Sequence, residues 1–130
     1  MNARSTLFAA GIFGAIGVGL GALGAHALEP FLAEKGMAHA WDTAARYHMI
    51  HAIALLAIAV WRRSDRGAAA RRADWAARCW TAGIVLFSGS LYGLALGGPR
   101  WLGPITPLGG IALMAGWVCV AAAAFAKNEE

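Results

Sequence analysis

The residues from Thr6 to Leu28 constrain this chain most, because they include no charged side chain. A helix needs about 20 mostly apolar residues to cross the hydrocarbon core of a bilayer, so this segment predicts a membrane span over 6–28. A cleaved signal peptide is the alternative, since Arg4 precedes the run and Ala25-His26-Ala27 resembles a cleavage site. The run is longer than the apolar core of such peptides, about 7–15 residues.

Composition supports a membrane protein throughout. Of 130 residues, 59% are hydrophobic and 14% are charged, whereas soluble domains have about 45–50% apolar and about 25% charged residues. We therefore expect one transmembrane domain over 1–130. The net charge of +4 does not indicate nucleic-acid binding, because the arginines cluster between apolar segments. Cys79 and Cys119 fall within apolar segments and are expected to be buried thiols rather than a disulfide.

Three further segments are long enough to span, and they predict an all-α, up-down four-helix bundle. They are 40–61, 79–97 and 106–126. Thr106-Pro107 indicates the start of the last helix, with Thr106 as N-cap. Between the first two spans, Pro30 and Gly36 indicate a short helix lying on the membrane surface, with an exposed loop as the alternative.

A basic loop over 62–78 predicts the orientation. Eight Lys and Arg residues fall on its side of the membrane and three on the other, which places both termini in the cytoplasm of a bacterial inner membrane. The loop could also bind anionic lipid, although topology alone accounts for its charge. Trp61, Trp75 and Trp80 fit an aromatic belt at this boundary.

Glycines recur at three- and four-residue spacing within the first and third apolar segments. In lipid, such smooth stripes let helices approach closely. We expect the stripes to pack against other helices, and they are Gly14, Gly17, Gly21, Gly24, Gly89 and Gly93.

The second span carries ionisable groups, which in a membrane are a functional-site hypothesis by default. Asp42 and Arg46 stand at i,i+4 and are expected to pair. His48 and His51 are expected to point inward, with His51 near the midplane, about 15 Å from the inner boundary. With polar side chains of the other spans they predict a polar layer, whose members are His51, His48, Tyr47, Ser88, Tyr92, His26 and Thr106.

Three interpretations of this layer stay open. Its side chains hydrogen-bond between helices and only hold the fold, since buried polar atoms must be satisfied in lipid. Alternatively, His48 and His51 bind a metal or haem, or the layer passes protons or a small solute. Catalysis is not expected, because no nucleophile, base and acid stand together. No cofactor is firmly implied.

The motifs GALGAHALEPFL, WDTAARYHMIHAIALL, LFSGSLY and ITPLGG resemble the YgdD/DUF-423 family over nearly the whole chain. These are small four-span inner-membrane proteins, similar to a mitochondrial transmembrane branch in animals. The resemblance implies fold and location but no established activity. In the family, the position of His48 more often carries glutamine, which favours His51 acting with Tyr47 or Ser88. The other family positions are Gly24, His26, Phe87, Ser88, Gly89, Ser90, Tyr92, Thr106, Pro107, Gly109 and Gly110.

Taken together, the sequence predicts a structural or accessory membrane protein that contacts lipid and packs with other membrane proteins or with itself. A histidine-bearing site for a metal, haem, proton or small solute is the alternative function.

Overall fold

The computed structural model describes residues 1–64 and 67–126, and within these ranges every regular element is a helix. Four long helical segments, one of them made of α4, η1 and α5, are joined by turns, two of which contain short helices. The elements are α1 (Ala3–Ala25), α2 (Glu29–Glu34), α3 (Ala38–Trp61), α4 (Ala68–Gly83), the π-helix η1 (Ile84–Ser88), α5 (Gly89–Ala95), the 3-10 helix η2 (Arg100–Leu102) and α6 (Ile105–Ala123).

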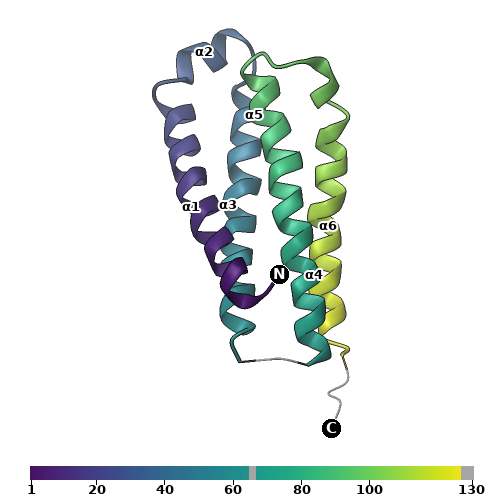
Figure 1. The fold of residues 1–130 in the computed structure, drawn as a ribbon. Coiled ribbons are helices and arrows are strands. Elements are labelled where there is room, and N and C mark those ends of the chain that lie inside the picture. The colour runs from purple at the N-terminus through teal and green to yellow at the C-terminus, as the bar shows by residue number, and fades with distance from the viewer. Residues whose placement is uncertain (65–66, 127–130) are drawn as a thin grey trace.

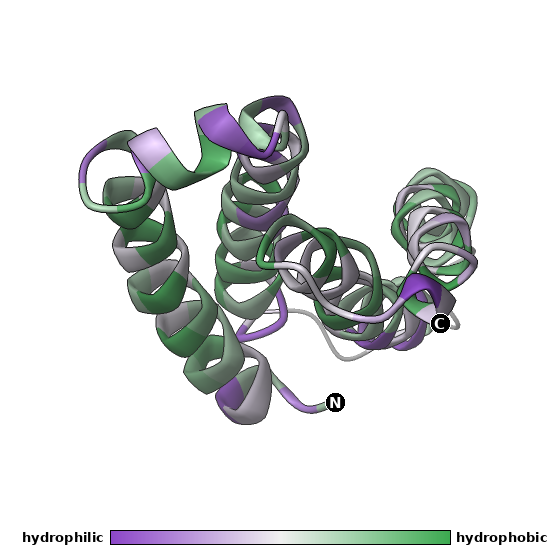
Figure 2. Cartoon of the chain, turned by 90° about the horizontal axis from the view of Figure 1, so that it is seen from above, coloured by the Kyte–Doolittle hydropathy of each residue, from purple (hydrophilic) through white to green (hydrophobic). Residues whose placement is uncertain are grey.

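Neighbouring long segments run antiparallel (Figure 1). α4, η1 and α5 follow one another without an intervening residue and make one long segment. α1 packs mainly on α3, whereas α6 packs mainly on α4 and η1. Seen from above, α1 and α6 therefore lie at opposite ends of a row, with their apolar outer faces uncovered (Figure 2).

Three helical segments among the described residues are long and apolar enough to cross a membrane, namely Ala3–Ala25, Ala38–Trp61 and Arg100–Ala123. They correspond to the predicted spans 6–28, 40–61 and 106–126. The predicted span 79–97 is not a single α-helix, because η1 divides it.

The prediction of a basic loop over 62–78 is wrong for most of its length, because α4 begins at Ala68. Alanine and arginine are strong helix formers. The alanines at positions 70, 73, 76 and 77 are buried, while Arg71 and Arg78 point outward. Arg62 closes the short connection by donating two hydrogen bonds, of 2.9 and 2.8 Å, to the Asp74 carboxylate.

The turns at the opposite end are built as short helices. α2 has a proline in its first turn, and Gly36 follows it at φ +66°, a backbone conformation that favours glycine. The prediction that Thr106 caps the last helix is wrong, because α6 begins at Ile105 with Pro104 at the N-cap position. The Thr106 hydroxyl instead lies 2.7 Å from the Ser90 hydroxyl, within hydrogen-bonding distance.

Two clusters of apolar side chains hold the helices together. One joins α1, α3, α4, η1 and α6 around Leu55, Trp80 and Leu113, and the other joins α2, α3 and α5 around Leu32, Trp41 and Tyr92. Along α3, His48 and His51 fall between Trp41 and Leu55. The two buried histidines of the predicted polar layer therefore lie between the two clusters.

Candidate functional site

The two buried histidines of α3 face different neighbours. Both side chains are 3% exposed. His48 contacts Phe13 of α1 and Tyr92 of α5, whereas His51 contacts Trp80 of α4 and Trp117 of α6. The structure therefore does not bring the two rings to one shared ligand position, which removes the basis for a His48–His51 metal pair.

Both ring nitrogens of His51 are engaged. Nδ1 lies 2.7 Å from the backbone oxygen of Tyr47, which can only accept, so Nδ1 carries the proton. Nε2 accepts a 3.0 Å hydrogen bond from the indole N–H of Trp117, which can only donate. His51 is thus a neutral imidazole that links α3 to α6, and it has no free lone pair for a metal.

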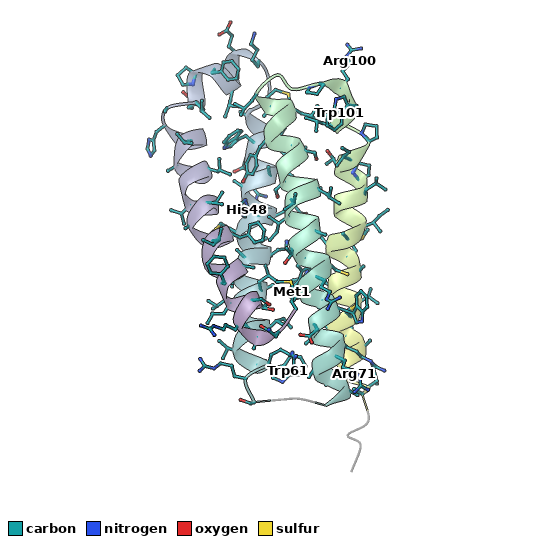
Figure 3. All side chains as sticks on the ribbon, in the orientation of Figure 1. Met1, His48, Trp61, Arg71, Arg100 and Trp101 are labelled. Atoms are coloured by element: carbon teal, nitrogen blue, oxygen red, sulfur yellow. The ribbon has the colours of Figure 1, made fainter. Side chains whose placement is uncertain are left out.

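His48 is less completely satisfied. Its Nδ1 lies 3.3 Å from the Tyr92 hydroxyl. Its buried Nε2 forms no hydrogen bond of good geometry with a described residue, although the backbone of Phe13 in α1 interacts with the ring. The ring meets Phe13 edge-on, with centroids 5.8 Å apart, and a Cβ at Gly17 of α1 would lie 3.5 Å from Nε2. Nε2 therefore points into the interface between α1 and α3, at mid-height of the molecule (Figure 3).

The serine and threonine hydroxyls join helices in pairs. Ser88 donates a 2.8 Å hydrogen bond to the carbonyl of Ala44, joining η1 to α3. Ser90 and Thr106 join α5 to α6. These groups satisfy each other or the backbone, as buried polar atoms must in lipid.

Two predicted members of the layer lie at its edge. Tyr47 stacks on His51 at a centroid distance of 6.3 Å but is 42% exposed. His26 is exposed and forms the C-cap of α1, away from the other members. No group of three or more His, Cys, Asp or Glu suited to a metal occurs in residues 1–64 and 67–126.

Tryptophan side chains form hydrogen bonds between helices that were not predicted from the sequence. Trp41 donates to the carbonyl of Leu20 at 2.9 Å, and Trp80 to the carbonyl of Leu113 at 3.2 Å. Trp80 is 1% exposed, so its prediction as a belt residue is wrong, whereas Trp61 and Trp75 are exposed. The available signal was position: Trp41 and Trp117 each lie within an apolar segment, where an indole N–H needs a partner.

The glycines divide into two groups. A Cβ at Gly17 would lie 2.7 Å from Met49 Sδ, and one at Gly24 would overlap the Trp41 ring, so these two pack inside the molecule. Gly93 packs against Leu102. A Cβ at Gly14, Gly21 or Gly89 would meet nothing within 4 Å.

The tightest approach of two helices uses glycines outside the predicted stripes. A Cβ at Gly109 of α6 would overlap the backbone nitrogen of Phe87 in η1, and one at Gly116 would overlap the Trp80 ring. The motifs LFSGSLY and ITPLGG therefore meet in space, where η1 and α5 pack on the start of α6.

Comparison with known proteins supports the membrane assignment. Residues 20–110 match the family described as "Protein of unknown function (DUF423)". A UPF0382 membrane protein of Staphylococcus haemolyticus is 43% identical over 83% of this chain and 84% of its own length. YwdK of Bacillus subtilis, also a UPF0382 membrane protein, is 43% identical over 84% of this chain and 86% of its own.

The similarity extends to a eukaryote. A UPF0382 membrane protein of Schizosaccharomyces pombe is 34% identical over 83% of this chain and 91% of its own length. No solved structure matches the chain significantly. With its apolar helices and these membrane-protein relatives, the chain belongs to the DUF423 family of membrane proteins.

Proposed function

We propose that this chain is a four-span, non-catalytic protein of the bacterial inner membrane that associates with other membrane helices, either of a partner or of a second copy. The fourth span is the apolar part of the segment formed by α4, η1 and α5. From Cys79 to the end of α5 at Ala95 it extends about 25 Å at 1.5 Å per residue, most of the hydrocarbon thickness of about 30 Å.

The observation that carries this proposal is the set of glycines with no neighbour. Glycine within a helix costs about 1 kcal/mol relative to alanine. Gly17, Gly24 and Gly109 offset this cost with close contacts inside the molecule, whereas Gly21 and Gly89 have no heavy atom near their Cβ positions. In lipid, a second helix packed on such a glycine supplies the missing contact.

The buried polar groups also favour a structural role. His51 uses both ring nitrogens, and the hydroxyls of Ser88, Ser90 and Thr106 all bond to other groups of the chain. A serine hydroxyl that donates to a backbone carbonyl is not paired with a general base, which an activated nucleophile requires.

The test is the size of the complex in mild detergent, measured by native gels and light scattering. Gly21→Leu and Gly89→Leu should reduce it without lowering helix content or thermal stability, because the new side chains enter open space and leucine favours a helix more than glycine does. Gly17→Leu is the folding control, since its side chain must displace Met49 and His48. An unchanged size in both outward variants would refute association through these glycines.

His48 supports a second candidate function, a site for a metal, a proton or a small solute. The buried Nε2, which forms no hydrogen bond of good geometry with a described residue, is the observation that favours it. Elemental analysis of protein purified without added metal tests the metal form: near-stoichiometric zinc, iron or copper should disappear in His48→Gln. Metal that remains in this variant, or a protein without metal, would exclude His48 as a ligand.

A further inference from the structure

An apolar groove runs along the outer side of the contact between α1 and α3. It has a volume of about 160 Å³ and is lined mainly by Leu7, Gly11 and Gly14 of α1 and by Met49, Ile53 and Leu56 of α3. Gly11 and Gly14 hollow it, because a Cβ at either position would meet nothing within 4 Å.

The groove opens at the arginine-rich end of the molecule into a wider, basic hollow. This hollow has a volume of about 450 Å³ and is lined by Ala3, Arg4, Leu7 and Arg63. Leu7 lines both spaces, so they are adjoining. Arg4 and Arg63 are exposed and make no ion pair with a described residue, unlike Arg62, which is bound to Asp74.

We propose that this groove binds one anionic phospholipid, with its phosphate between Arg4 and Arg63 and one acyl chain along Gly11 and Gly14. Guanidinium groups match phosphate oxygens in bidentate geometry. A basic pocket between two spanning helices is the setting in which anionic headgroups bind.

The length of the groove fits an acyl chain. Arg4 and Gly14 are ten residues apart on α1, which is about 15 Å along the helix axis. That distance is half of the hydrocarbon thickness of about 30 Å, the depth of one leaflet.

The hollow at the opposite end of α1 has different chemistry. It has a volume of about 170 Å³, and its lining includes the carboxylates of Glu29 and Asp42. Asp42 is paired with Arg46, but Glu29 repels a phosphate and no basic residue lines this hollow, so the two ends of α1 should differ in lipid preference.

Native mass spectrometry of the full chain in mild detergent tests the proposal. The probes are palmitoyl-oleoyl phosphatidylglycerol and the phosphatidylcholine with the same chains. Wild type should retain one phosphatidylglycerol in preference to phosphatidylcholine. Arg4→Gln/Arg63→Gln should bind it about 30-fold more weakly, from the effect of two arginines near a lipid headgroup. Gly14→Leu should lose the lipid by filling the groove.

Two matched control variants distinguish binding in this groove from general electrostatic attraction between anionic lipid and exposed arginines. Arg71→Gln/Arg78→Gln removes the same charge from exposed arginines outside the groove, and Gly19→Leu adds the same side chain at another open glycine of α1. Both should bind like wild type. Equal loss in the two arginine pairs, or equal retention in all variants, would overturn the proposal. So would a Gly14→Leu protein that keeps the lipid but changes its oligomeric size, because the groove would then hold a helix.

Discussion

His51 is the residue whose role the structure defines most sharply. Replacing it with leucine leaves the Trp117 N–H unpaired and should lower the free energy of unfolding by about 1–2 kcal/mol, the range for one lost hydrogen bond and a desolvated donor. His51→Gln should cost less, because an amide oxygen can accept from the indole. Thermal unfolding in detergent measures both. With Trp117→Phe, a double-mutant cycle should give a coupling of about 0.6 kcal/mol, and a coupling of zero would mean that the hydrogen bond stabilises nothing.

Interactions between side chains close in the sequence were predictable, and interactions between distant side chains were not. The i,i+4 spacing predicted the Asp42–Arg46 ion pair, which is observed at 2.7 Å. Ser88 and Tyr92 are also four residues apart, and both bond to α3. The partner of His51 lies 66 residues away on α6. No local sequence pattern predicts a contact between residues so far apart in the chain, because the contact depends on which helices become neighbours.

Among the elements, the contact of η1 with α6 should be the least tolerant of added volume. Gly109→Ala places a methyl group on the backbone nitrogen of Phe87 and 2.7 Å from the carbonyl carbon of Leu86. Backbone atoms cannot rotate away, so α6 must shift, and we expect a loss of about 1–3 kcal/mol by the usual cost of overpacking. Gly110→Ala is the matched control, since its Cβ makes an ordinary 3.7 Å contact with the Phe87 ring. Unfolding curves that coincide for the two variants would contradict the close approach.

Helix positions followed from the sequence better than helix ends and irregularities. The apolar runs located α1, α3 and α6 to within a few residues. α4 was missed over its first eleven residues, because its arginines suggested a loop although its alanines form a buried face. The π-helix Ile84–Ser88 had no sequence signal. It arises where backbone meets backbone at Gly109, a contact that only the assembled fold contains.

For the whole molecule, hydropathy and charge indicate membrane segments and their order but not their lateral arrangement. α1 and α6 contact mainly one neighbouring segment each, so the described chain forms an open row rather than a closed ring of helices. Rotation and tilt of a span are set by packing against its neighbours. Trp41 on Leu20 and Gly109 on Phe87 fix that packing here.

The proposed orientation predicts on which side of the membrane a fused reporter protein will lie. Trp61 and Arg71 lie at one end of the molecule, and Arg100 and Trp101 lie at the other (Figure 3). If α4, η1 and α5 cross the membrane, both termini share the arginine-rich side, which the positive-inside rule assigns to the cytoplasm. A fluorescent protein fused to either terminus should then fold and fluoresce, whereas alkaline phosphatase should be active when inserted between Gly97 and Gly98 but inactive at either terminus.

Removing arginines whose side chains form no hydrogen bond or ion pair with a described residue tests whether charge sets this orientation. Arg63→Gln/Arg71→Gln/Arg78→Gln keeps Arg62 and Arg72, whose hydrogen bonds to Asp74 and to the Ala122 carbonyl hold the helix ends together. This variant should give a mixed population, with partial phosphatase activity at the C-terminus, because the difference in charge between the two sides is reduced. Termini on opposite sides in the unmodified chain would mean three spans, and the segment from Cys79 to Gly97 would then have to lie outside the bilayer core.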